Sequence, residues 1–485
     1  MDSPGAIREA FDASIARRTH KIDFLSCMHH SARQFVIRRS GDRTEVIAGV
    51  TTFLSMVYIL AVNPNILSAA GMDSAAVFTA TAVSAFFGTL FMAFFANYPV
   101  ALASGMGLNA YFAFSVCIPM AKAGINDPWK IALTAVLVEG IIFVLLSLTN
   151  FREKLVNDVP SNLKYGITAG IGLFITIVGL KGAGVVIGSE STLVDLGSVS
   201  TPQFVLAMIG FVIICVLVHY NVPGAVLWGI LLTWIMGIIA QLTGWYHVDP
   251  AKEVYSLIPS LSGASFIPKA PTMFAFDFAW VGKNIVEFAV IVFSFLFVDL
   301  FDTVGTLIGV ASKGGLLDEN GNLPRAKGAL LSDAFGTILG ACFGTSTVTS
   351  YVESTAGVAA GGRTGLTAVV TGVLFLISLF FSPIFLAIPG FATTPALVYV
   401  GLLMLTSVKN MDFDSDIADT AGGFMAIIMM PFTYSIANGI MFGMITWVLL
   451  KVITKKAKDI APVMWVAFFL FALRLGTLAY GIGFH

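Results

Sequence analysis

The 485 residues are 57% hydrophobic and only 11% charged, a composition too apolar for the surface of an ordinary soluble protein. The formal net charge of −1 at pH 7 suggests no nucleic-acid partner. The four cysteines are scattered, without a CxxC pair or metal-ligand spacing, so they predict no bound metal. The composition therefore indicates an integral membrane protein embedded in a lipid bilayer.

The N-terminal 45 residues form a polar segment in which basic side chains outnumber acidic ones. The positive-inside rule therefore predicts that residues 1–45 lie in the cytoplasm. Both an amphipathic surface helix and a disordered tail fit the composition of this segment.

Two uncharged runs follow, at 46–72 and 74–121, with room for three spans of about 20 residues each. The second run is interrupted at 97–99 and again at 105–107. An interrupted helix exposes unpaired backbone groups, which the membrane tolerates only against protein or a polar cavity. We therefore expect residues 103–109 to form a broken third span with a role in binding.

The remaining apolar stretches predict a long series of further spans. In the first half these are span four, which contains Glu139, and spans five to seven, at 131–148, 165–180, 204–220 and 224–242. In the second half, spans eight and nine lie at 284–310 and 329–342, and a broken span ten lies at 344–362. Spans eleven and twelve share 364–408, and spans thirteen and fourteen share 421–450. A final stretch at 461–473 fits either one more span or a re-entrant end.

The spans divide into two halves of seven, and because seven is odd the second half enters the membrane from the opposite face. The sequence thus predicts an all-α polytopic membrane protein of about 14 segments, a 7+7 inverted repeat with short broken spans three and ten, as in many secondary transporters. The predicted divisions are the N-terminal segment, the first repeat, an external connecting loop, the second repeat and a C-terminal apolar segment, at 1–45, 46–242, 243–283, 284–458 and 459–485.

Asp299 and Asp302 stand inside the predicted span eight, where ionisable side chains are costly and are usually retained because they contact a substrate, an ion or a proton. Their spacing of three residues places them on nearly the same face of a helix. A carboxylic acid in such a place can carry a proton that is coupled to a neutral substrate. Helix packing against a broken span is the alternative role for each.

Glu353 stands in the broken span ten among threonines and serines. A carboxylate beside backbone N–H groups matches the donors and acceptors of a planar, amide-like ligand. Asn109, in the broken span three, offers an acceptor and donors, and either binding or structural bonding fits it. Glu139 is a weaker candidate, because it stands alone in span four.

Two other classes of protein also use acidic residues in a membrane. An intramembrane aspartyl protease needs two aspartates, but on different helices and with a Gly-x-Gly-Asp sequence that is absent here. A channel needs a continuous pore, which discontinuous spans fit less well than alternating access. The sequence also contains no GxxxxGK[ST], so it predicts no P-loop ATPase within the chain.

Four segments resemble one known family. They are RTEVIAGVTTFLSMVYILAVNPNIL at 43–67, ANYPVALASGMGLNAYFAFSV at 96–116, FLFVDLFDTVGTLIGVA at 295–311 and GTSTVTSYVESTAGVAAGGRTGLTAVVTG at 344–372. They look like the AzgA-like purine permeases of the nucleobase-cation symporter-2 group, and the resemblance extends from Arg38 to the end. Ser104 and Tyr111 stand where members often have proline and phenylalanine, which leaves the backbone path of span three open.

The resemblance implies a core domain of spans one to four and eight to eleven and a gate domain of spans five to seven and twelve to fourteen. It implies H⁺ symport of hypoxanthine, guanine or adenine. It places the purine between spans three, eight and ten, near Asn109, Asp299 and Glu353 and the backbone of Gly107, Thr345, Ser346 and Thr347. Asp299 would take up the coupled proton and Asp302 would tune it. An aspartate at 299 favours hypoxanthine and guanine over adenine.

The sequence as a whole predicts a proton-coupled purine importer of the inner or plasma membrane rather than an enzyme, with a cytoplasmic N-terminus and no cofactor. Its partners are the purine base, H⁺ and the lipid bilayer. The preferred purine, H⁺ or Na⁺ as the coupling ion, and formation of a homodimer through the gate domain stay open at this point.

Overall fold

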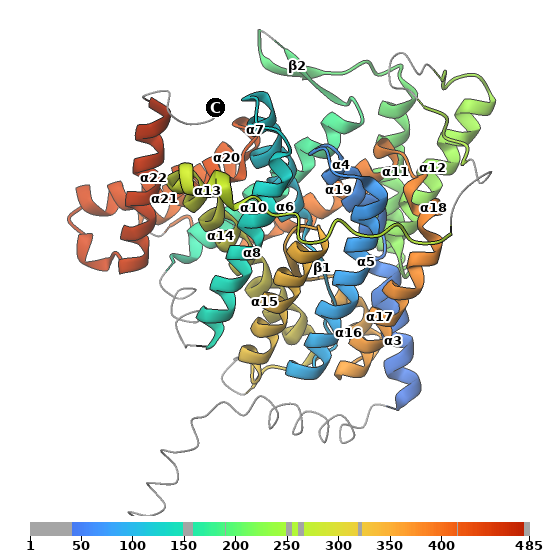
Figure 1. The fold of residues 1–485 in the computed structure, drawn as a ribbon, viewed down its shortest axis with the longest axis horizontal. Helices are drawn as coiled ribbons and strands as arrows, with labels where there is room; N and C mark the ends of the chain where they lie inside the picture. Colours follow the sequence, from blue (N-terminus) through green and yellow to red (C-terminus); the bar gives the residue numbers. More distant parts are fainter. Residues whose placement is uncertain are drawn as a thin grey trace, which may run out of the picture.

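The computed structural model describes residues 41–148, 159–189, 191–248, 255–259, 266–318, 323–414 and 416–479 (Figure 1). Nearly all of the predicted N-terminal segment lies outside this part, so its form and its cytoplasmic position stay predictions. The first helix, α3, begins at Asp42, inside the charged segment and before the predicted start of span one.

The first half of the chain follows the predicted order of seven spans. Its elements are α3 (Asp42–Met56), α4 (Ile59–Ser68), α5 (Ser74–Phe91) with the π-helical turn η1 (Met92–Ala96), β1 (Leu102–Ser104), α6 (Met106–Ala110), the π-helical η2 (Tyr111–Cys117), α7 (Ile118–Lys122), α8 (Pro128–Leu148), α10 (Ser161–Gly182), β2 (Val186–Ser189), β3 (Leu193–Leu196), α11 (Pro202–His219) and α12 (Ala225–Leu242). Here α3 with α4 makes span one, and β1 through α7 makes the broken span three. The strands β2 and β3 form an antiparallel hairpin in the connection between spans five and six.

The second half repeats this order. Its elements are α13 (Phe278–Lys283), α14 (Ile285–Gly314), α15 (Ala326–Phe343), β4 (Val348–Ser350), α16 (Ser354–Ala359), α17 (Gly365–Ile377) with η4 (Ser378–Phe381) and α18 (Ser382–Leu386), α19 (Gly390–Leu405) with η5 (Thr406–Asn410), α20 (Ile417–Phe432), α21 (Ile436–Ile453), η6 (Ala457–Asp459) and α22 (Pro462–Ala479). Here α14 is span eight and β4 with α16 is the broken span ten. The final apolar stretch forms the continuous helix α22.

Local sequence accounts for several of these boundaries. The side chain of Asp73 caps α5 by accepting a hydrogen bond from the N–H of Ala76 at 2.9 Å. Gly344 ends α15 at a positive φ of 88°, a conformation that glycine adopts without steric cost. The turn at Gly344 directs the chain from α15 straight into the broken span ten.

The two broken spans meet at the middle of the molecule. The strands β1 and β4 pair antiparallel, with Leu102 opposite Ser350 and Ser104 opposite Val348. The Gly105 N–H also donates to the Thr347 carbonyl at 3.0 Å. The interruption in each repeat thus satisfies the backbone groups of the other, which a membrane interior requires.

Nine helical segments in the described parts of the chain are long and apolar enough to cross a membrane. The spans that fall outside this group are the two broken ones together with α14, α15 and α20. Adding them completes two sets of seven, so the chain is a multi-pass membrane protein with the predicted 7+7 inverted repeat and broken spans three and ten.

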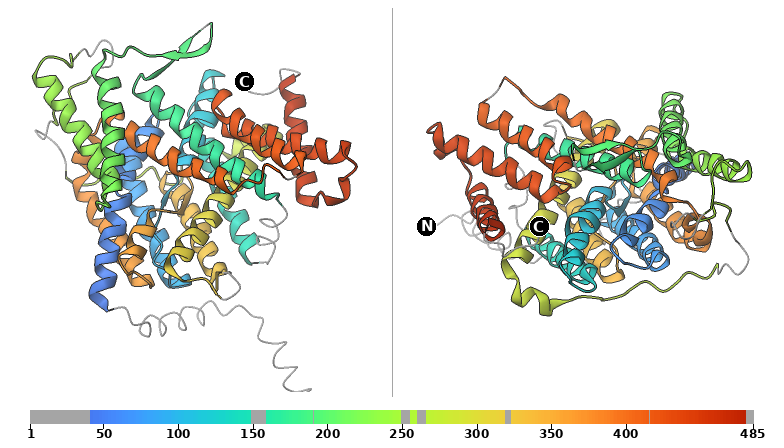
Figure 2. Two further views of the ribbon diagram at one scale, coloured as in Figure 1. Left: turned by 180° about the vertical axis from the view of Figure 1, so that it is seen from behind. Right: turned by 90° about the horizontal axis from the view of Figure 1, so that it is seen from above.

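The spans pack into a core and a gate. In the core, α15 packs against α5 and α8, while α17 packs against α3 and α5. In the gate, α10 packs against α19 and α20, while α11 packs against α12 and α19. The ribbon views place α11 and α12 at one edge of the molecule and α20 to α22 at the opposite edge (Figures 1 and 2).

Glycines allow close helix contacts within each group. A Cβ atom on Gly357 of α16 would lie 2.0 Å from Thr52 Oγ1 of α3, in the core. In the gate, a Cβ atom on Gly166 of α10 would lie 2.4 Å from the carbonyl oxygen of Gly423 on α20. Small residues are the usual means of close backbone approach in membranes, where burying apolar surface gives little driving force.

Candidate functional site

A small cavity lies where the broken spans meet α14 and the gate. Polar side chains of Asp302, Thr306, Ser350, Tyr351 and Glu353 line it, together with the backbone at Gly107. Ile171 of α10 and Val400 of α19 close it from the gate side. Its volume of about 60 Å³ is well below the roughly 300 Å³ or more of typical ligand pockets, so a purine base does not fit in it in this conformation.

Glu353 is held by a tyrosine from another span. The Tyr58 hydroxyl donates to Glu353 Oε1 at 2.5 Å, and Tyr58 itself is fully buried between α3 and α4. Glu353 is only partly buried, at the residue preceding α16, and its carboxylate lies at the cavity wall. The structure thus places this predicted residue at the cavity and adds Tyr58, which the sequence analysis missed.

The two aspartates of α14 take different positions. Asp302 lines the cavity and is partly exposed, whereas Asp299 is fully buried and does not line it. Asp299 Oδ1 lies within hydrogen-bond distance of the Thr303 hydroxyl oxygen, at 3.1 Å. A spacing of three residues therefore directs one carboxylate to the cavity and the other into the core.

Asp333 of α15 is a further buried carboxylate that the sequence analysis missed. Its Oδ1 atom lies 2.9 Å from the Thr303 hydroxyl oxygen and accepts a hydrogen bond from the Ser350 N–H at 3.2 Å. The sequence could have identified Asp333, because it is the only charged residue in the stretch 329–342. An ionisable residue inside an apolar span is the same feature that identified Asp299.

Asn109 lies behind the strand crossing rather than at the cavity. It is fully buried, and its Oδ1 atom accepts a hydrogen bond from the Ser104 hydroxyl at 2.8 Å. Ser104 Oγ also lies 3.2 Å from Thr345 Oγ1, which accepts from the Asn63 amide at 2.9 Å. In this closed structure the amide of Asn109 therefore stabilises the junction of the broken spans.

The residues whose backbone was predicted to contact the base lie partly at the cavity and partly in the junction behind it. Gly107 lines the cavity, whereas Thr345, Ser346 and Thr347 are fully buried in the junction behind it. The Thr347 hydroxyl donates to Glu139 Oε2 at 2.8 Å, so the acid of span four pairs with the broken span ten. Within the described residues no cluster of three or more His, Cys, Asp or Glu side chains is arranged to hold a metal ion.

A larger cavity of about 640 Å³ lies nearer the end of the molecule where α10 ends and α14 begins. Both cavities are lined by α10 and α14, but at different levels of these helices. On α10 the large cavity is lined by Val178 and the small one by Ile171, and on α14 by Ile291 and Val298. Each pair is seven residues apart, which is about 10 Å along a helix. The rings of Tyr111 and Phe295, 4.7 Å apart and both buried, stand between these levels. The large cavity is thus separated from the small one by an aromatic layer.

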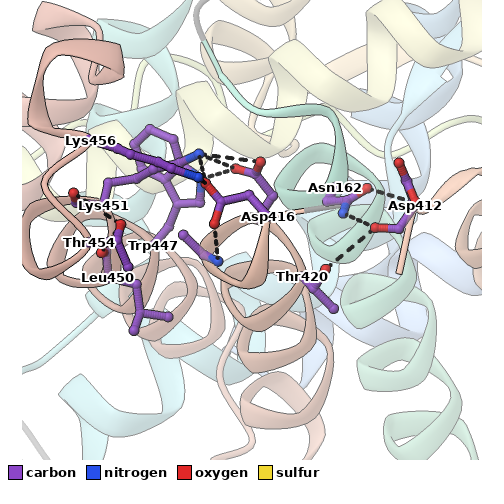
Figure 3. A network of polar contacts seen from close by, with 11 residues as sticks. Asn162, Asp412, Asp416, Thr420, Trp447, Leu450, Lys451, Thr454 and Lys456 are labelled. Atoms are coloured by element: carbon purple, nitrogen blue, oxygen red, sulfur yellow. Dashed lines mark hydrogen bonds and ion pairs between the residues drawn. The ribbon is translucent and has the colours of Figure 1, made fainter. Parts of the chain in front are cut away.

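A polar network ties the gate helices together at the start of α20 (Figure 3). Asp416 Oδ2 lies 2.7 Å from Lys451 Nζ and 2.9 Å from Lys456 Nζ. These two lysines, and next the N–H of Ala418, hold the pKa of the Asp416 carboxyl well below its usual range. Asn162 of α10 donates to the Asp412 carbonyl at 2.6 Å and joins α10 to the same corner.

Comparison with known proteins places this arrangement in a family. A model described as the permease family matches residues 43–442. The guanine/hypoxanthine permease PbuO of Bacillus subtilis is 44% identical over 443 residues, covering 91% of this chain and 99% of that protein. The adenine permease AdeP of Escherichia coli is 42% identical over 445 residues, covering 91% and 95%.

A solved structure shares the fold. The murine anion transporter Solute Carrier 26 family member A9, in its inward-facing state, superposes with a TM-score of 0.63, covering 90% of this chain and 73% of that chain. Its 13% sequence identity limits the likeness to the fold. With the family match over most of its length and relatives above 40% identity, the chain belongs to the permease family.

Proposed function

We propose that this permease imports purine nucleobases together with protons by movement of the core against the gate. The observation that carries the proposal is the small cavity, where Glu353 and Asp302 face the same space at the junction of two broken spans and α14. Relatives at 42% and 44% identity that are named adenine and guanine/hypoxanthine permeases support a purine as the substrate.

Glu353 is the main ligand of the base in this proposal. The N–H groups on the edge of a purine are donors, and a carboxylate accepts two of them side by side. The hydrogen bond from Tyr58 holds one oxygen of Glu353 in place before the base arrives, which lowers the entropic cost of binding. The backbone at Gly107 borders the same space and completes the binding surface.

The coupled proton resides on the aspartate pair of α14. Asp302 is in contact with the cavity, and Asp299 lies buried one turn away, so a proton on this pair is close to the bound base without competing for it. A neutralised carboxyl also moves through the membrane at lower cost than a charged one. We propose Asp299 as the group whose protonation accompanies binding and Asp302 as the group that adjusts it.

The small volume of the cavity supports alternating access, because a purine base needs more room than this conformation provides. The large cavity, on the far side of the aromatic layer, would form the route from outside the cell, with the N-terminal end of α3 on the cytoplasmic side of the inner or plasma membrane. Asn109 and Asp299, which are buried in the core, would reach the base through a local rearrangement at the junction of the broken spans. Hypoxanthine and guanine are the favoured substrates, and adenine is the alternative.

Uptake in cells that lack their own purine permeases tests this function. Cells producing the full chain should accumulate radiolabelled hypoxanthine, and a protonophore should abolish the accumulation. Glu353→Gln should lose uptake at an unchanged amount of protein in the membrane, whereas Asp127→Asn, an exposed acid paired with Lys130, should retain it. The proposal fails if the intact protein reaches the membrane and takes up none of hypoxanthine, guanine and adenine.

A further inference from the structure

The hydroxyl of Thr303 lies between two buried carboxylates. Thr303 Oγ1 is 3.1 Å from Asp299 Oδ1 and 2.9 Å from Asp333 Oδ1. It is also 2.7 Å from Thr349 Oγ1, on β4. All four side chains are at most 1% exposed, so each of these contacts lies away from water.

The number of hydrogens in this group favours a protonated carboxyl. A threonine hydroxyl has one hydrogen to donate and otherwise accepts, and an ionised carboxylate can only accept. Thr303 can therefore donate in one of its three contacts and must accept in the other two. The Thr349 hydroxyl supplies one of the accepted hydrogens. The other must come from Asp299 or Asp333, so the three hydrogen bonds are complete only when at least one of these acids holds a proton.

The surroundings of Asp333 also favour a shared proton over two negative charges. The titratable side chains within the membrane on the neighbouring elements are Glu139 of α8 and Asp299 and Asp302 of α14, all of them acids. The elements α5, η1, β1 and β4, which also pack against α15, contribute no titratable side chain. Two interacting carboxyls of this kind titrate as a pair.

We propose that Asp333 is a second proton-holding residue, which shares the transported proton with Asp299 through the Thr303 hydroxyl. This inference rests on the proposed function, because it concerns the route of the coupled proton. In the transfer, the O–H bond of protonated Asp299 breaks as its proton passes to Thr303 Oγ1. The original hydroxyl proton of Thr303 passes at the same time to Asp333. Two protons shift, and the net result is the transfer of one proton: Asp299 becomes a carboxylate, Asp333 becomes a carboxylic acid, and no other reactant is needed.

Asp333 lies between the small cavity and the end of α15 at which the helix begins. Asp333 is seven residues along α15 from Ala326, about 10 Å from the end of the helix at the side where α3 begins. Its Oδ1 atom also accepts from the N–H of Ser350, a residue that lines the small cavity. A proton on Asp333 is therefore farther from the base than one on Asp302, yet it acts directly on the backbone of the broken span ten.

Transport by the purified full chain in proteoliposomes tests the assignment. Asp333→Asn keeps an oxygen that accepts from Ser350 but cannot hold the proton, and Thr303→Val removes the relay while Thr303→Ser retains it. Asp333→Asn and Thr303→Val should still exchange radiolabelled hypoxanthine across the membrane without a gradient. Their accumulation driven by a pH gradient should fall to the level that a protonophore gives, whereas Thr303→Ser should accumulate like the unmodified chain.

Two outcomes would overturn the proposal. One is full pH-driven accumulation by Asp333→Asn. The other is loss of exchange together with accumulation in Asp333→Asn and Thr303→Val, which would give these residues a role in binding or packing. Exchange by the unmodified chain is therefore measured first. If the unmodified chain exchanges no purine, the proposed function fails, and the result does not bear on Asp333.

A spectroscopic measurement tests the shared proton without any substrate. At neutral pH the purified chain should show an infrared carbonyl band of a buried protonated carboxylic acid that shifts in deuterated water. The band should shift or weaken in Asp333→Asn and stay unchanged in Asp127→Asn. A band that is the same in Asp333→Asn and in the unmodified chain would contradict the proposal.

Discussion

At the scale of single residues, hydrogen bonds decide which acids of the membrane interior face the cavity. Glu353 and Asp302 border it, while Asp299 and Asp333 are engaged with Thr303. The sequence identified Glu353, Asp299 and Asp302 because ionisable residues in apolar spans are conspicuous. It could not tell which carboxylate of α14 faces the cavity, since residues three apart share a helix face only approximately and the neighbouring helices decide the rest.

Removing the hydroxyl that holds Glu353 should weaken binding of the base. Tyr58→Phe deletes a hydrogen bond to a charged group, a contact worth about 1.5–3 kcal/mol, so the half-saturating hypoxanthine concentration should rise roughly tenfold or more. Initial rates of radiolabelled uptake at several concentrations measure this. Tyr246→Phe, which loses only a bond to the Tyr255 carbonyl, is the matched control. Equal half-saturation in Tyr58→Phe and the unmodified chain would show that this bond does not prepare the site.

At the scale of elements, the broken spans were predictable and their pairing was not. The interruptions at 97–99 and 105–107 and the many glycines, serines and threonines of 344–362 marked the two broken spans. The antiparallel register of β1 with β4 joins residues almost 250 positions apart, for which a single sequence carries no signal. The same pairing explains why Asn109 is turned to the junction, where it bonds Ser104.

A single methyl group between core and gate should slow transport. A Cβ atom on Gly107 of α6 would lie 2.7 Å from Ile171 Cγ2 of α10, closer than side chains normally approach. Gly107→Ala should therefore lower the maximal uptake rate, and Ile171→Ala in the same chain should restore part of it. Gly182→Ala, which meets no atom within 4 Å, is the control. Unchanged uptake by Gly107→Ala would mean that this contact does not limit the transport cycle.

The ion pairs at the start of α20 should stabilise the gate in a pH-dependent way. The pKa of Asp416 is lowered from 3.8 by Lys451 and Lys456, so its contribution is present above that value and is lost as the pH falls through the folded-state pKa. Asp416→Asn can still cap α20 but cannot pair with the lysines. The variant should have a lower Tm in detergent at pH 7, and the difference should shrink near pH 3. A difference that is the same at both pH values would contradict the electrostatic explanation.

At the scale of the whole molecule, the sequence was sufficient to predict the architecture. Span lengths, the position of the interruptions and the odd number of segments per half led to the 7+7 inverted repeat. The end of the chain was ambiguous in sequence because 461–473 is short for a span, whereas the structure continues it into the helix α22 (Pro462–Ala479). Its contacts with α14 and α21 supply the packing that apolarity alone did not reveal.

The proposed transport cycle needs a conformational change of the whole molecule. The small cavity, at about 60 Å³, is too small for a purine, and the proposed movement of the core relative to the gate along α6, α10 and α14 would enlarge it. In this proposal the acids in the core would travel with the base, and each would need to be paired or protonated during the movement. The proposal thus links substrate movement to proton movement through the cost of charge in the membrane.

The central claim is that base and proton cross together, and simultaneous measurement of both fluxes tests it most directly. The purified chain would be placed in vesicles that contain a pH-sensitive dye, and radiolabelled hypoxanthine would be added outside. The account predicts that the vesicle interior acidifies as hypoxanthine enters, in a fixed ratio, and that Glu353→Gln abolishes both signals. Entry of hypoxanthine without any change of internal pH would contradict it.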